Sequence, residues 1–195
     1  MNAHIPLSPS LESLVAQYAS GGLGFGMSVL MASFVTLSPA ARQQLETLER
    51  INGLFLDEAE QVELSGDALD AVLDKLDMDA DATSDEIFVS ELNTDLPTPL
   101  RAVLDKPIED EKWRFAYPGV RQVKLPIGDN GETVKLLKIK PGKAAPRHTH
   151  SGIEATLVLR GAFRDGNRLY ERGELALILE GCAVSTPRVN ILACS

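Results

Sequence analysis

The sequence predicts an α+β chain of two modules, an N-terminal helical bundle followed by a β-barrel or sandwich. Apolar residues recur at helical spacing up to about residue 77, and short alternating stretches separated by turns follow from about residue 112. The charge divides in a similar way: residues 1–110 carry 20 Asp and Glu against 5 Lys and Arg, whereas residues 111–195 carry 8 against 14. Two electrostatically distinct halves favour two modules.

Four helices are expected in the first module. The first begins after Ser8 with Pro9 at its first position, the second spans about 26–37, the third runs from Ser38-Pro39 to about residue 56, and the fourth follows Ser65. The second helix is apolar nearly all round, so it must be enclosed by neighbours or by a partner. Side chains expected to face inward in the other three are Leu11, Leu14, Val15, Tyr18, Leu45, Leu48, Ile51, Leu54, Phe55, Leu69, Val72, Leu73 and Leu76.

An acidic stretch rich in small residues, DMDADATSDE at 77–86, marks a linker. The expected organisation is a helical domain over 1–77, a linker over 78–95 and a β-rich domain over 96–195. A short helix is expected at 100–104. Strands are expected at 113–117, 120–125, 133–140, 155–159, 168–170 and 174–178, with a further apolar strand at the C-terminus that includes Cys194.

A candidate metal site lies in the run GKAAPRHTHSGIEATLVLRG at 142–161. His148 and His150 alternate with one intervening residue, so on an extended strand both imidazoles project from one face, and Glu154 follows beyond an expected turn at 151–152. Imidazole nitrogens with a carboxylate oxygen suit zinc, iron, manganese, nickel or copper. The alternative is a solvated surface pair of histidines.

The spacing from Gly142 through the two histidines and Glu154 to Gly161 matches the first metal motif of the cupins, so this segment resembles a cupin, a jelly-roll β-barrel. Together with LPTPLRAVL, WRFAYPGVRQVKL and the helical module, it resembles the ChrR family of anti-sigma factors. The match is specific from Leu96 to about Gly173. The resemblance implies a zinc-binding anti-sigma domain joined to a cupin domain, which together hold an extracytoplasmic-function sigma factor inactive until a stress signal releases it.

Two features depart from the family pattern. The N-terminal zinc motif, one histidine and two cysteines, falls in this sequence on Phe34, Ser38 and Ala41, so we expect a metal-free helical module with Phe34 supplying packing. The fourth cupin ligand, a histidine, falls on Val184 or Ser185. The protein ligands His148, His150 and Glu154 would then hold a divalent metal, zinc first and iron, manganese or nickel as alternatives, with positions left for water or a small ligand.

The resemblance implies a transcription regulator of the cytoplasm that masks basic faces of a sigma factor, with the cupin module as sensor and a homodimer through the cupin domain as an option. The alternative is a metal-dependent cupin oxygenase, isomerase or hydrolase. Arg147 and Arg160 are the charged residues nearest the site for that chemistry. The acidic balance of residues 1–110 argues against direct binding of nucleic acid and favours a partner protein with basic surfaces.

The longest uncharged stretch, between Glu12 and Arg42, is broken by glycines and leaves only about thirteen apolar residues, short of a membrane span. The N-terminus also lacks the basic region of a signal peptide. Cys182 and Cys194 are either redox-active or ordinary buried thiols. Trp113 and Phe115 are expected to be barrel residues rather than ligand contacts.

Overall fold

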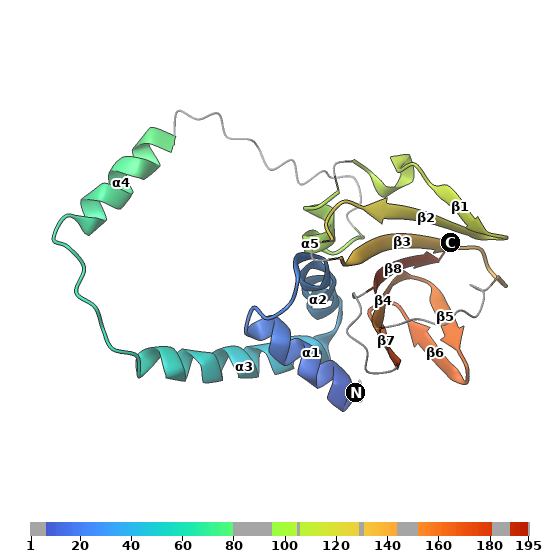
Figure 1. Cartoon of the computed structure of the whole chain (residues 1–195), viewed down its shortest axis with the longest axis horizontal. Coiled ribbons are helices and arrows are strands. Elements are labelled where there is room, and N and C mark those ends of the chain that lie inside the picture. Colours follow the sequence, from blue (N-terminus) through green and yellow to red (C-terminus); the bar gives the residue numbers. More distant parts are fainter. Residues whose placement is uncertain are drawn as a thin grey trace.

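The computed structural model describes residues 7–79, 95–104, 106–128, 131–143, 152–180 and 188–194. Helices fill the N-terminal part and strands the C-terminal part (Figure 1). The helices are α1 (Pro9–Ala19), α2 (Phe25–Leu37), α3 (Pro39–Asp57), α4 (Ala68–Asp79), the short α5 (Thr98–Arg101) and the 3₁₀ turn η1 (Ile108–Asp110). The strands are β1 (Arg114–Tyr117), β2 (Val120–Leu125), β3 (Thr133–Ile139), β4 (Gly152–Arg160), β5 (Ala162–Asp165), β6 (Arg168–Glu171), β7 (Leu175–Glu180) and β8 (Arg188–Cys194).

Six of these strands form one sheet in the order β1-β2-β3-β8-β4-β7, and β5 and β6 form a separate hairpin. The sheet is mixed rather than wholly antiparallel, because β8 runs parallel to both β3 and β4. β7 and β8 lie on either side of β4.

Helix α2 is the most buried helix of the described chain. Met27, Leu30, Met31 and Phe34 have 0–2% of their surface exposed, and Ser33 satisfies its buried hydroxyl by donating to the Val29 carbonyl at 2.8 Å. The expectation that this helix is enclosed is confirmed. One wall of the enclosure is α1, whose Leu11, Leu14 and Val15 are buried as expected in the same apolar core.

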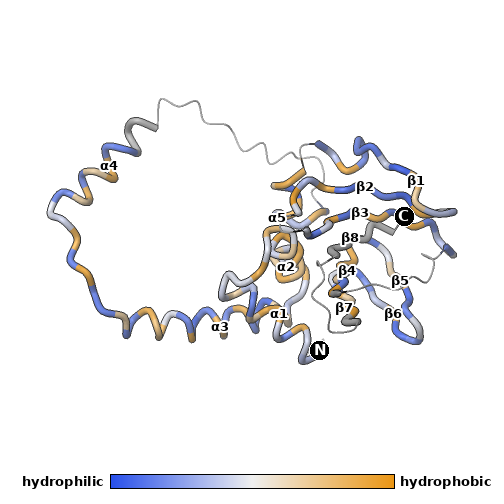
Figure 2. Tube along the Cα trace, viewed as in Figure 1, coloured by the Kyte–Doolittle hydropathy of each residue, from blue (hydrophilic) through white to orange (hydrophobic). Residues whose placement is uncertain are grey.

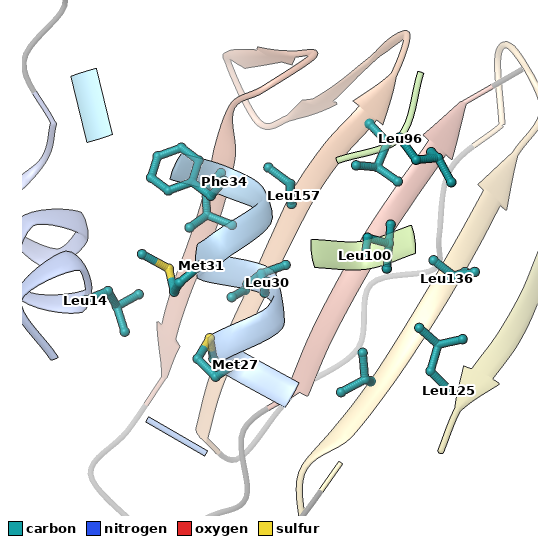
Figure 3. Packing of buried hydrophobic residues seen from close by; sticks show 14 of the residues in the cluster. Leu14, Met27, Leu30, Met31, Phe34, Leu96, Leu100, Leu125, Leu136 and Leu157 are labelled. Atoms are coloured by element: carbon teal, nitrogen blue, oxygen red, sulfur yellow. The ribbon is translucent and has the colours of Figure 1, made fainter. Parts of the chain in front are cut away.

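The other wall is the β-sheet, so the two halves of the chain share one core. Helix α2 lies across the face of the sheet that carries Leu125, Leu136 and Leu157 (Figure 3). At the start of the helix the Gly26 N–H donates to Glu132 Oε2 at 3.0 Å. A Cβ on Gly26 would overlap the Val134 side chain and approach Glu132 Oε2 to 2.8 Å, so only glycine allows this approach.

The expected inward faces of the third and fourth helices are wrong in part. Leu45 and Leu48 pack against the core, but Ile51, Leu54 and Phe55 at the end of α3 are 44–68% exposed. In α4, Leu69, Val72 and Leu73 are 48–69% exposed. The reason is geometric: the end of α3 projects past α1 and α2, and α4 lies apart from the other helices (Figure 1). The described side chains of α4 therefore do not join α1, α2 and α3 in a bundle.

The strands agree with the alternating pattern. β2 has the expected bounds, β3 lacks only the last expected residue, and β4 is longer than expected because Gly152 is its first strand residue rather than part of a turn. The hairpin strand β5 was not predicted. Gly119 closes the β1–β2 turn with φ of +82°. No helix within the described ranges is long and apolar enough to cross a membrane.

Candidate metal and partner-binding sites

Glu154 is the one predicted metal ligand that the structure describes. It lies on β4, opposite Ile178 of β7, with 8% of its surface exposed. A carboxylate so enclosed is costly to leave charged unless other groups stabilise it, and a divalent cation is one such group. The donor type and the burial therefore fit a metal ligand.

The other two predicted ligands, His148 and His150, lie outside the described residues, as do Arg147 and Cys182. Among the residues that are described, no group of three His, Cys, Asp or Glu side chains could hold a metal ion. The complete ligand set therefore remains a prediction. Of Cys194, the structure gives only the backbone, which pairs with Ile139 at the end of β8 as expected for a terminal strand.

Arg160, considered above for chemistry at the metal, is occupied elsewhere. Its guanidinium binds the Asp95 carboxylate through two hydrogen bonds of 2.6 and 2.9 Å and approaches Glu109 at 3.5 Å. The hydrogen bond from Arg160 holds the pKa of Asp95 below its ordinary value, and the same bond raises the pKa of Arg160. Arg172 adds a bond to the Asp95 carbonyl at 2.9 Å. Arg160 thus anchors the chain at Asp95 to the end of β4.

The three positions that replace the N-terminal zinc ligands all have structural roles. Phe34 is 2% exposed within the core. Ser38 caps α3, with its hydroxyl accepting from the Ala41 N–H at 3.4 Å, and Ala41 is fully buried. An aromatic ring, a capping hydroxyl and a methyl group do not bind zinc, so the residues present do not fit a metal here. The packing role expected for Phe34 is confirmed.

A second candidate site is the arm, which we define as residues 51–79, from the end of α3 through α4. It carries nine Asp or Glu and one Lys. Its large apolar side chains are exposed by 44–83%, and Figure 2 shows hydrophobic residues along α3 and α4 away from the core. These exposed side chains are Ile51, Leu54, Phe55, Leu56, Val62, Leu64, Leu69, Val72 and Leu73. Exposed apolar side chains in this number make the arm a candidate interaction surface.

The chain is similar in sequence to known proteins. The family model described as the ChrR cupin-like domain matches residues 105–180. The anti-sigma-E factor ChrR of Cereibacter sphaeroides is 33% identical over 167 residues, which are 85% of this chain and 76% of that protein. The chain belongs to the ChrR family of anti-sigma factors.

The crystal structure of Rhodobacter sphaeroides SigE in complex with the anti-sigma ChrR extends this likeness to three dimensions. Its matching chain has a TM-score of 0.72 and 32% identity, with 89% of this chain and 86% of that one covered. Membership of the ChrR family confirms the cupin-like nature of the second module, although the sheet described here is open, with β1 and β7 at its edges.

Proposed function

We propose that this chain is an anti-sigma factor that sequesters a sigma factor through its helical part, with the arm as a major contact surface. The observation that carries the proposal is the exposed apolar stripe of the arm, set among acidic residues. A sigma factor presents basic surfaces that bind DNA, and an acidic partner surface with apolar anchors complements them. The SigE complex of the related ChrR supports the same class of partner.

The masking is steric and electrostatic and needs no bond chemistry. Apolar side chains of the arm would bury against the sigma factor, while the surrounding carboxylates would pair with its basic side chains. The proposal also explains why amphipathic helices in the arm are left uncovered in the free chain. Their apolar stripes would be completed by the partner.

Isothermal titration calorimetry with purified sigma factors of the source organism tests the proposal. Leu69→Asp places a charge on a 69% exposed apolar residue of the arm, and Leu169→Asp makes the same change at a 44% exposed leucine on β6. We expect one sigma factor to bind the wild type, and Leu69→Asp to weaken it by at least about tenfold, as for loss of a buried anchor. Leu169→Asp should leave the affinity unchanged. Equal effects of the two changes, or no binding by the wild type, would contradict the proposal.

We also propose that His148, His150 and Glu154 hold one divalent metal, zinc first, in the cupin module. The burial of Glu154 on β4 supports this. A bound metal would act as a Lewis acid and as a structural tie between the histidine segment and β4. Elemental mass spectrometry should find about one metal per chain, lost in His148→Ala and in Glu154→Gln. Glu174→Gln, which changes a half-buried carboxylate paired with Arg168, should retain the metal. Metal that persists in Glu154→Gln would remove Glu154 from the ligand set.

The finer organisation is also proposed. The family match supports closure of the 96–195 domain as a jelly-roll barrel, separated by the 78–95 linker from the 1–77 domain, and a sigma-factor partner supports a place in the cytoplasm and a role in stress response. The exposed Phe115 on edge strand β1 supports a homodimer through the cupin domain. Analytical ultracentrifugation should then find a dimer for the wild type and a monomer for Phe115→Asp. A metal-dependent enzyme remains the alternative, and turnover that depends on Glu154 would favour it.

A further inference from the structure

A groove of about 870 Å³ lies against β1, β2 and β3, and five of its eleven lining residues are basic. Its charged lining residues are Lys106, Glu111, Lys112, Arg114, Lys124 and Lys135. Within the described part of the chain, the one ion pair in this lining joins Lys106 to Glu111 at 3.6 Å. Five cationic groups and one carboxylate leave the groove strongly positive.

The sheet register brings two of these cations together. Lys124 of β2 lies directly opposite Lys135 of β3, and Arg114 of β1 lies opposite Gln122, two residues along the same face as Lys124. Directly opposed residues have Cβ atoms about 4.5–5.5 Å apart, and like charges at this spacing destabilise a sheet. An anion between the two ammonium groups would relieve the repulsion.

Four residues of the lining lie on the same face of the sheet as Glu154, namely Gln122, Lys124, Thr133 and Lys135. Thr133, which lines the groove, and Glu154 both pair with position 188 of β8, so they project to one side at a separation of two strand spacings, about 10 Å. Helix α2 covers the opposite face, which carries Val134 and Leu136. A ligand in the groove would therefore lie beside the proposed metal position and away from the helical core.

We propose that the groove binds a small anion that carries several phosphate groups. Lysine ammonium groups and an arginine are suited to phosphate oxygens, and Gln122 and Thr133 supply neutral donors. The volume lies within the roughly 300–1,000 Å³ of small-molecule sites. This inference goes beyond the binding of a sigma factor and does not rest on it. It gives the cupin module a chemical input of its own.

The acidic arm of the same chain is a less suitable occupant. Its exposed leucines would need an apolar surface, but Val123 and Leu125 are buried in the core on the opposite face of β2. Both line the groove but are buried, so Pro126 is the exposed apolar residue of its lining. Only the attraction between the carboxylates of the arm and the basic residues of the groove would hold the arm in the groove.

Titration calorimetry of the full chain with tripolyphosphate and with ATP, at low and at physiological salt, tests the proposal. Lys124→Gln/Lys135→Gln removes the opposed pair in the groove. Arg121→Gln/Lys138→Gln removes an equally opposed pair on the other face, outside the groove. We expect tripolyphosphate to bind the wild type. Its affinity should fall by more than about tenfold in the groove variant, because two charge-assisted contacts are lost. The control variant should bind within about twofold of the wild type.

Thermal unfolding supplies a second readout. Without ligand, the groove variant should unfold at a higher temperature than the wild type, because the repulsion is gone, and tripolyphosphate should no longer raise that temperature. Arg114→Gln, on the edge strand, provides a milder variant with weakened binding. ATP binding more tightly than tripolyphosphate would identify a nucleotide as the source of the phosphates, and equal binding would identify the phosphate chain itself. No binding of either anion, equal losses in the control variant, or saturation only by a peptide of residues 57–79 would overturn the proposal.

Discussion

Replacement of Gly26 by alanine should weaken the packing of α2 against the sheet. The added Cβ would overlap Val134 and press on the Glu132 carboxylate that accepts the Gly26 N–H. Overpacking costs about 1–3 kcal/mol, and a strained hydrogen bond to a charged group about 1.5–3 kcal/mol. The better helix propensity of alanine returns about 1 kcal/mol. We therefore expect a net loss of about 1.5–5 kcal/mol in the free energy of unfolding.

Gly53→Ala is the matched control. Gly53 also lies within a helix, α3, but nothing lies within 4 Å of the position its Cβ would take. This change should stabilise the chain by about 0.5–1 kcal/mol through helix propensity. Urea unfolding followed by circular dichroism measures both variants, and the thermal midpoint of Gly26→Ala should fall by roughly 3–20 °C, at about 2–4 °C per kcal/mol. If Gly26→Ala were as stable as the wild type, α2 would not be docked on β3 as described.

Three further predictions concern the core, its independence of metal and the Asp95 anchor. Phe34→Ala should lower the free energy of unfolding by about 3–5 kcal/mol, measured in urea, because a fully buried ring leaves a cavity. Chelator should not unfold α1 to α3 in the wild type. For the anchor, the pKa of Asp95 is lowered in the folded state, so its stabilising effect is present above the unfolded-state pKa of about 3.9 and is lost as pH falls through the folded-state value. Asp95→Asn should therefore be less stable than the wild type at pH 7, by at most about 1 kcal/mol because the ion pair is exposed. The difference in the free energy of unfolding should vanish in acid. A difference that grows in acid would contradict the role given to Asp95.

The sequence pattern predicted which residues form elements better than it predicted what covers them. The apolar stripes of α3 and α4 correctly marked helices, yet Phe55, Leu69 and Val72 are exposed. An apolar stripe indicates that one face of a helix prefers burial, but it does not indicate whether the same chain or another protein buries that face. The enclosure of α2 was predicted for the same reason, but its neighbour across the core is the sheet, which no local pattern can indicate.

The sequence contains a turn signal for the β5–β6 hairpin. Asp165 pairs with Arg168 across the two residues Gly166-Asn167, a short turn of the kind that joins antiparallel strands. The strand AFRD is short and polar on its own, so it was missed, although Phe163 stacks on Tyr170 with ring centroids 5.1 Å apart. The metal site was predicted from spacing, and of its ligands only the burial of Glu154 can be compared with the structure.

The fate of the three former zinc positions has a physiological consequence. In this chain Phe34, Ser38 and Ala41 hold α2 and α3 together by packing and capping, which need no cofactor. A regulator whose partner-binding fold depends on bound zinc loses that fold when the cell is starved of the metal or when oxidants attack the zinc-binding thiolates. In this chain neither metal starvation nor thiol oxidation would alter the contact between α2 and α3, because Phe34, Ser38 and Ala41 bind no zinc and carry no thiol. Any release of a partner must then start elsewhere in the chain, and the face of the sheet that bears Glu154 is where a chemical change could begin.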